Sequence, residues 1–180
     1  MNVAESPRDT ARRLADEAAI LAAVHRYCRG VDRADAELTR SAYHPDATDD
    51  HGAFKGPAHE FAERVNAAHA TRWSSTMHVV ANHSAVVRGD AADAETYVIA
   101  YLRRLDGGHL DVVGGRYIDR FERRHGQWRI ARRVYVCEWT AAVPTAGSLI
   151  DAGAYVPGRR DRHDPSYSGM LSEPGAPADG

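Results

Sequence analysis

The chain has 180 residues with 23 basic and 25 acidic side chains, a length that suits one domain with a core and a pocket. The near-neutral charge argues against a broad nucleic-acid-binding face. No apolar run approaches the roughly 20 residues that cross a bilayer, and the first 13 residues lack the apolar segment of a signal peptide. We therefore expect a cytoplasmic protein that binds neither nucleic acid nor membrane. The two cysteines, Cys28 and Cys137, fall in a helical and a strand pattern and predict buried free thiols.

The N-terminal part of the chain predicts three helices separated by polar segments. Apolar residues recur at helical spacing, Gly30 suits the exit of the first helix, and Pro57 suits the first turn of the third. The expected helices cover 9–30, 35–43 and 56–70, with an acidic loop over 46–54.

From Trp73 onward the pattern changes to long extended runs, separated by compact hairpin signals rich in Gly and Asp. Strands of this length should be strongly twisted and curled, and Gly114-Gly115 predicts a bulge in the third run. Helices followed by an antiparallel meander predict an α+β fold with the helices on one face of the sheet. The four runs cover 73–88, 94–105, 109–123 and 127–139.

The composition changes again after Val143, where Pro, Gly, Asp, Arg and Ser dominate and apolar periodicity is lost. We expect one domain over 1–143 and an extended or partly disordered tail over 144–180. The tail side chains that suit packing against a neighbouring surface are Tyr167, Met170 and Leu171.

Several short segments stand out by their order and spacing: Tyr27-Cys28-Arg29-Gly30-Val31-Asp32, Tyr43-His44-Pro45-Asp46-Ala47, His51-Gly52-Ala53-Phe54-Lys55-Gly56, Met77-His78-Val79-Val80-Ala81-Asn82 and Trp128-Arg129-Ile130. Together they resemble the SnoaL-like family of the nuclear transport factor 2-like superfamily, over roughly 18–139. The resemblance implies a cone-shaped fold, in which a curled antiparallel sheet is closed by the N-terminal helices around an apolar cavity.

The resemblance also implies a catalytic group. Dehydratase-like members use an Asp–His dyad, a Tyr or Lys one helical turn before the Asp, and an Arg on the last strand. The positions that match are Asp32, His78, Tyr27 and Arg133, although Arg132 is adjacent and a one-residue slip would exchange the two arginines. The Asp32 carboxylate would fix the tautomer of His78 and raise its basicity, so that the imidazole could move protons near neutral pH.

Each of these residues also has a purely structural explanation. Asp32 suits the cap of the helix that begins near Asp35. His78 suits a hydrogen-bonded core histidine, Tyr27 lies on the apolar stripe of its helix, and Arg133 suits a row of surface arginines. The remaining aromatic residues are expected to form core or cavity wall, and the candidates for substrate binding are Tyr43, Trp73, Tyr97, Tyr101, Tyr117 and Tyr135.

The acidic cluster formed by Asp46, Asp49, Asp50 and His51 invites comparison with a metal site, because hard divalent cations prefer several carboxylates. Its spacing does not match a calcium loop, and the chain has no zinc-type set of Cys and His residues. We therefore expect a solvated turn near the mouth of the pocket, with no metal and no cofactor.

These inferences predict a cofactor-independent lyase, of the dehydratase or dehydrohalogenase type, acting on a small, apolar, cyclic substrate. His78 would abstract a proton, while Tyr27 and Arg133 would polarise a carbonyl or assist the leaving group. The alternatives are a polyketide cyclase or isomerase reaction and, from another class, a non-catalytic ligand-binding or dioxygenase small-subunit-like protein. We expect a homo-oligomer, a trimer ahead of a dimer, because the convex face of the sheet keeps apolar side chains.

Overall fold

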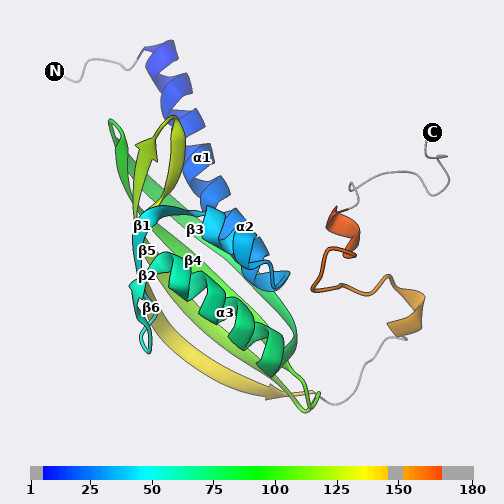
Figure 1. Ribbon diagram of the computed structural model, residues 1–180. Helices are drawn as coiled ribbons and strands as arrows, with labels where there is room; N and C mark the ends of the chain where they lie inside the picture. The colour runs from blue at the N-terminus through cyan, green and yellow to red at the C-terminus, as the bar shows by residue number, and fades with distance from the viewer. Residues whose placement is uncertain (1–5, 146–151, 168–180) are drawn as a thin grey trace.

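The computed structural model describes residues 6–145 and 152–167. Three helices cover one face of a curled, unclosed sheet of six strands, which makes the fold α+β (Figure 1). The elements are α1 (Pro7–Asp32), α2 (Ala36–Ser41), β1 (Tyr43–Asp50), β2 (Lys55–Pro57), α3 (Ala58–Arg72), β3 (Trp73–Arg88), β4 (Ala91–Arg104), β5 (His109–Arg124), β6 (Gln127–Pro144) and the short 3-10 turns η1 (Ala152–Ala154) and η2 (Pro165–Tyr167).

The first helix owes its boundaries to local chemistry. The Ser6 side chain accepts the backbone N–H of Asp9, and Pro7 occupies the first turn, where its missing N–H costs nothing. Gly30 lies inside this helix and does not form its exit. A Cβ at Gly30 would meet the backbone nitrogen of Thr39 at 2.5 Å, so the glycine serves the close approach of α2 to α1.

The strand order in the sheet is β2-β1-β6-β5-β4-β3. β3 to β6 form the expected antiparallel meander, and a register shift at Gly114/Gly115 confirms the predicted bulge. β1 runs parallel to β6, so the sheet is mixed and not wholly antiparallel. The expected loop over 46–54 was wrong, since it contains most of β1.

The charged residues of β1 explain this error. Asp46 and Asp50 give the segment its loop-like polarity, yet each is neutralised at the surface, by Arg124 and by Lys55 respectively. The residues between them alternate between buried and exposed positions in the manner of a strand that is covered on one face.

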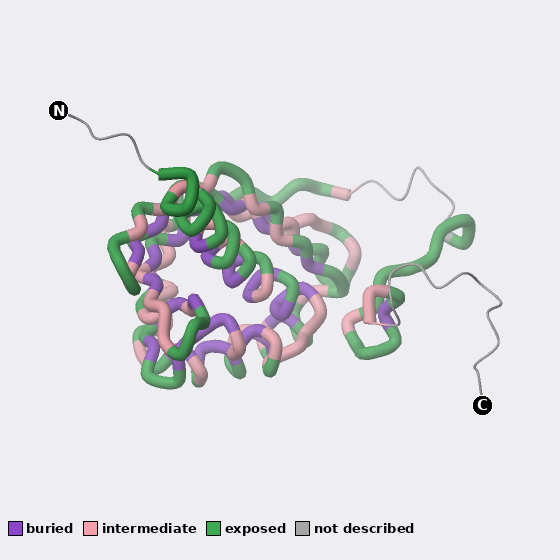
Figure 2. The backbone as a smooth tube through the Cα atoms, turned by 90° about the horizontal axis from the view of Figure 1, so that it is seen from above, coloured by how far each residue is buried: buried purple, intermediate pink, exposed green. Residues whose placement is uncertain are grey.

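The core lies between the helices and the concave face of the sheet, where the buried segments of Figure 2 gather. Cys28 belongs to this core as a free thiol, as expected. Cys137 is free but exposed, which corrects the prediction that it is buried. It pairs with Gly115 at the bulge, where the exposed C-terminal part of β6 begins.

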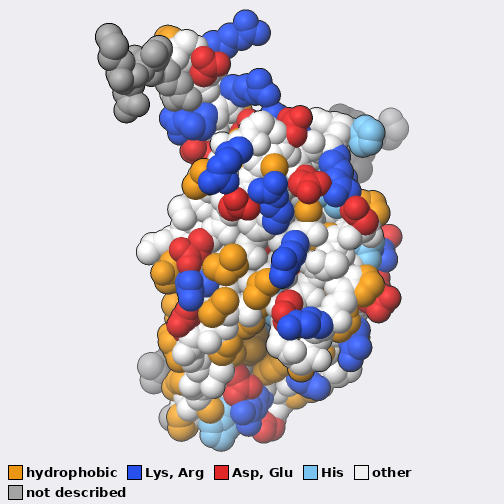
Figure 3. Space-filling model, turned by 90° about the vertical axis from the view of Figure 1, so that its left-hand side faces the viewer, with side chains coloured by type: hydrophobic (Ala, Val, Ile, Leu, Met, Phe, Trp, Pro, Cys, Tyr) orange, Lys and Arg blue, Asp and Glu red, His pale blue; other side chains and the backbone are white. Residues whose placement is uncertain are grey.

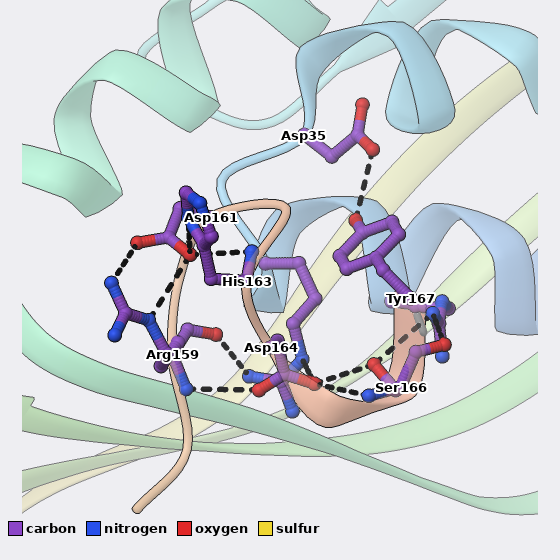
Figure 4. A network of polar contacts seen from close by, with 9 residues as sticks. Asp35, Arg159, Asp161, His163, Asp164, Ser166 and Tyr167 are labelled. Atoms are coloured by element: carbon purple, nitrogen blue, oxygen red, sulfur yellow. Dashed lines mark hydrogen bonds and ion pairs between the residues drawn. The ribbon is translucent and has the colours of Figure 1, made fainter. Parts of the chain in front are cut away.

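The part of the tail that the structure describes packs on its own chain. The hydroxyl of Tyr167 donates to Asp35, and Ser166 receives hydrogen bonds from Arg29, as part of the polar network in Figure 4. Arg160 donates to the backbone carbonyls of His69 and Trp73, at the junction of α3 and β3. The described residues 159–167 therefore make specific contacts with α1, α3 and the segment before α2. Met170 and Leu171 lie outside the described residues.

In the described ranges, 6–145 and 152–167, no helix has both the length and the apolar character that crossing a bilayer requires.

Candidate active site

Asp32 and His78 form a hydrogen-bonded pair between the last residue of α1 and the middle of β3. The Nδ1 atom of His78 lies 2.7 Å from one carboxylate oxygen of Asp32, and the backbone N–H of His78 donates to the other oxygen at 2.9 Å. Because β3 is an edge strand, alternate backbone N–H groups lack a partner strand, and Asp32 accepts one of them. The two contacts fix both the position and the ring orientation of His78.

This geometry determines which nitrogen of the His78 ring is basic. The side chains of His78 and Asp32 are only 8% and 12% exposed, so their interaction is poorly screened by water. A carboxylate accepts hydrogen bonds only, so Nδ1 carries the proton and the lone pair of the neutral ring lies on Nε2. Within the described residues Nε2 makes no hydrogen bond, and the ring borders a cavity.

The cavity has a volume of about 120 Å³ and lies between the helices and the concave face of the sheet. A cavity of about 150 Å³ with apolar walls accommodates benzene, so this volume is on the scale of one six-membered ring. Aliphatic side chains make up about half of its wall and aromatic or imidazole rings the remainder. The lining residues are Tyr27, His51, Val65, His69, His78, Val98, Ala100, Leu102, Val113, Tyr117 and Tyr135.

A wider groove of about 370 Å³ lies on the other side of the Asp32–His78 pair. Arg29 and Arg33 give it a cationic wall, and Ser166 of the tail borders it. His78 lines both spaces, so the pair separates an open, charged groove from the smaller and more apolar cavity.

Tyr27 reaches the same cavity from α1, five residues before Asp32. Its ring packs edge-on against Tyr43 and Tyr117, with ring centres 5.8 and 5.6 Å away. Burial, reinforced by the nearby Asp49 carboxylate, raises the pKa of Tyr27 well above its ordinary value, so the hydroxyl stays protonated. This hydroxyl has no hydrogen-bond partner in the part of the chain that the structure describes, so it remains available as a donor.

Arg133, not Arg132, points inward, and its side chain is fully buried. It forms a two-point ion pair with Asp119, at 2.8 and 2.6 Å, and its guanidinium lies over the rings of Tyr27 and Tyr117. Its charge is neutralised by Asp119. Arg133 lies behind the tyrosines and does not line the cavity.

The six aromatic candidates for substrate binding divide by position. Tyr117 and Tyr135 line the cavity. Tyr43 is buried behind Tyr27. Trp73 donates to Asp111 and packs behind His69, with ring centres 4.8 Å apart.

Tyr97 and Tyr101 do not line the cavity, contrary to the expectation. On β4 they alternate with Val98, Ala100 and Leu102, which are buried under the helices, so both tyrosines lie on the outer face of the sheet. Tyr97 is 44% exposed. Alternate residues of β4 thus face the cavity and the outer surface. The sequence alone does not indicate which of the two alternating sets faces inward.

Two cavity histidines were missed by the sequence reasoning. His69 follows Phe61 and Val65 at four-residue spacing on α3, a stripe that could have identified it as inward-facing. Burial, with the nearby His78 and Arg160, lowers the pKa of His69 to about 3, so its ring is neutral.

The other missed histidine is His51, which had been assigned to a solvated turn with Asp49. Asp49 is instead almost fully buried, and the His51 ring lines the cavity. Among residues 6–145 and 152–167, no group of three or more His, Cys, Asp or Glu side chains has an arrangement that would hold a metal ion.

Comparisons with known proteins agree with this architecture. The model of the SnoaL-like domain matches residues 12–134. A search of curated proteins gave no match.

Solved structures with the same fold include several with named activities. Hexachlorocyclohexane dehydrochlorinase (LinA) type 2 is 20% identical with a TM-score of 0.68, covering 78% of this chain and 97% of that one. LinA type 3 from Novosphingobium barchaimii LL02 is 24% identical with a TM-score of 0.66, covering 81% and 97%. A candidate scytalone dehydratase from Novosphingobium aromaticivorans is 19% identical with a TM-score of 0.68, covering 77% and 95%. At these identities the likeness establishes the fold.

Proposed function

The chain belongs to the SnoaL-like domain family, and within that family we propose that it is a cofactor-independent lyase that removes a proton and a leaving group from a small cyclic substrate. The observation that carries this proposal is the Asp32–His78 pair, in which the His78 ring borders a small, largely apolar cavity. A histidine kept only for core packing would not need a buried carboxylate on Nδ1 beside an empty space.

His78 is the proposed general base. Its Nε2 lone pair takes a proton from a carbon next to an activating group such as a carbonyl. Asp32 holds the ring in the required tautomer and stabilises the imidazolium that forms. Positioned acid–base catalysis contributes about 10²–10⁴-fold, and the low-dielectric cavity strengthens each charge interaction that accompanies it.

Tyr27 is the proposed donor to the substrate carbonyl. Its raised pKa keeps the hydroxyl protonated, and it borders the same cavity as His78. We assign Arg133 a positioning role in place of direct contact with substrate. Its guanidinium lies 4.4 Å from the centre of the Tyr27 ring, and it is held in place by Asp119.

The cavity volume limits the substrate. At about 120 Å³ it suits a single ring and is small for the polycyclic product of a polyketide cyclase. The apolar side chains Val65, Val98, Leu102 and Val113 favour a mainly hydrocarbon ring. These features support an elimination on a monocyclic molecule over a cyclisation. We further propose that the protein works as a homo-oligomer in the cytoplasm.

The experiment follows loss of HCl from 3-chlorocyclohexanone, which gives the ultraviolet-absorbing cyclohex-2-enone and needs only proton abstraction plus a good leaving group. The wild-type protein should exceed the uncatalysed rate, and His78→Ala should return to it. The matched control is His109→Ala, a histidine at the start of β5 that does not line the cavity. Turnover that survives in His78→Ala would refute the assignment of the base.

A further inference from the structure

A second carboxylate–imidazole pair borders the cavity, and the proposed reaction as described so far uses neither member. Asp49, on β1, lies with one carboxylate oxygen 2.5 Å from Nδ1 of His51, and its other oxygen accepts the hydroxyl of Tyr43 at 2.7 Å. Asp49 is 1% exposed, and His51 lines the cavity together with His78. Two of the three imidazoles that line the cavity, those of His51 and His78, therefore each have a carboxylate on the Nδ1 atom.

The ring of His51 is held on both faces. It stacks on Phe61 of α3, with ring centres 4.3 Å apart and planes 21° apart, and on Tyr135 of β6, at 4.8 Å and 9°. These two stacking contacts fix the plane of the His51 ring. The hydrogen bond to Asp49 fixes the orientation of the ring within that plane. Within the described residues the hydrogen bond of the His51 ring is the one at Nδ1, and its Nε2 makes none.

Among the basic side chains of the described residues, His51 is the one that bonds Asp49. Asp49, Arg133 and Asp119 occupy matched positions on the neighbouring strands β1, β6 and β5. Arg133 gives its two-point ion pair to Asp119, and in the described residues no Lys or Arg bonds Asp49. A buried carboxylate is stabilised by such a hydrogen-bonded partner. An imidazole that is held at Nδ1 in this way and carries a proton on Nε2 presents that N–H to the cavity as a donor.

We propose that Asp49 and His51 are the general acid of this cavity, complementary to the Asp32–His78 base, and that the substrate therefore loses a hydroxyl, as a cyclic hydroxy ketone would, and not a halide. This inference rests on the proposed function. A halide departs as a stable anion without a proton, whereas a hydroxyl departs as water only after receiving one.

The proton balance is complete. The C–H bond breaks as its proton passes to Nε2 of His78, and its electron pair forms the new C=C bond. The C–O bond breaks, and the leaving oxygen takes the proton from Nε2 of His51 and departs as water. His78 then holds one proton more and His51 one fewer, and exchange with solvent restores both.

The test compares two substrates that differ only in the leaving group and give the same product. Both 3-hydroxycyclohexanone and 3-chlorocyclohexanone yield cyclohex-2-enone. His51→Gln and Asp49→Asn should each lower the hydroxyl reaction about 100-fold or more and leave the chloride reaction within about threefold. His78→Ala should lower both reactions. Asp50→Asn is the matched control, since Asp50 is the next residue of β1 and pairs with Lys55 at the surface.

The outcomes separate the two claims. Equal losses on both substrates, or no loss on either, would overturn the acid assignment while leaving the base in place. If the Asp49–His51 pair only held β1, α3 and β6 together, substitutions at these residues would lower the unfolding midpoint. They would then affect the hydroxyl and the chloride substrate equally. If the wild-type protein turns over neither ketone, the proposed function fails, and ¹⁵N NMR of the imidazoles still decides the inference. A proton on both nitrogens of His51 at pH 7 supports it, and an unprotonated Nε2 rejects it.

Discussion

At the scale of single residues, the most consequential side chain is Asp32, because its carboxylate accepts hydrogen bonds from both the backbone N–H and the ring of His78. Helix capping and catalysis were competing explanations for Asp32 in the sequence. In the structure the cap of α2 is Asp35, whose side chain accepts the backbone N–H of Leu38. Asp32 is thereby free for His78.

The dyad predicts strongly non-additive mutant kinetics. Asp32→Asn and His78→Ala should each reduce turnover by about 10²–10⁴-fold, and the double mutant should lose no more than the worse single mutant, since the two residues act as a unit. Steady-state rates of the four proteins on 3-chlorocyclohexanone provide the cycle. A double mutant whose loss equals the product of the single losses would argue for two independent roles.

The low pKa of His69 predicts acid sensitivity of the fold. Its pKa is about 3 in the folded protein against an ordinary 6.5, so the unfolded chain binds the extra proton between these values. The stabilisation is complete above pH 6.5 and is lost as the pH falls towards 3, by about 2–3 kcal/mol at pH 4.5.

Urea unfolding at pH 7 and pH 4.5 would measure this loss. His69→Gln cannot take up the proton, so its unfolding free energy should fall by about 2–3 kcal/mol less than that of the wild type over the same interval. Equal falls in the two proteins would show that His69 is already protonated in the fold, or is accessible to water.

Residue-level prediction from sequence succeeded where a pattern fixed the neighbours. Asp32 and His78 are in contact, as expected. The choice between Arg132 and Arg133 was left open by the sequence, and Arg133 is the buried one. It failed where the face of a strand was undetermined: Tyr117 lines the cavity, but Tyr97 lies on the outer surface. A strand with aromatic residues at both parities gives no signal of which face the helices cover.

At the scale of the elements, the antiparallel meander and the three helices follow from periodicity and turn residues. β1 did not, because parallel pairing with the distant β6 is a long-range contact that leaves no local signature, and its surface aspartates suggested a loop. The cavity depends on this strand, because His51 follows directly after its last residue, Asp50. Because β1 was not predicted from the sequence, the pair formed by Asp49 and His51 was not recognised as part of the candidate site.

The packing of α2 on α1 gives an element-scale prediction. Gly30→Ala places a Cβ against the backbone of Thr39. Backbone atoms cannot avoid the clash by a change of side-chain rotamer, so α1 and α2 must move apart. We expect a loss of about 1–3 kcal/mol in unfolding free energy. Gly108→Ala is the control, because the nearest atom to its Cβ is a side-chain oxygen of Asp106 at 3.6 Å. Equal stability of the two variants in chemical denaturation would contradict the close-packing account.

At the scale of the whole molecule, the outer face of the sheet exposes several large apolar side chains. Hydrophobic side chains gather in the lower part of one side of the molecule in Figure 3, with charged side chains above them. The large hydrophobic residues exposed on β3 to β6 are Met77, Val79, Val86, Tyr97, Ile118, Trp139 and Val143. A surface of this kind is usually covered by another chain.

We therefore predict a homo-oligomer, a trimer ahead of a dimer, held by this outer face. Tyr97→Glu places a charge in its middle and should give monomers in light scattering at micromolar concentration. Leu105→Glu is the matched control, since Leu105 is also an exposed apolar residue but lies at the β4–β5 turn. A monomeric wild-type protein would contradict the predicted interface on the outer face of the sheet.

The central claim is that Asp32 prepares Nε2 of His78 as a base, and ¹⁵N NMR of the His78 imidazole tests it most directly. At pH 7 the account predicts a proton on Nδ1 and none on Nε2 in the wild type, with a mixture of tautomers in Asp32→Asn. A wild-type His78 that carries its proton on Nε2 would have no lone pair for the reaction and would contradict the account.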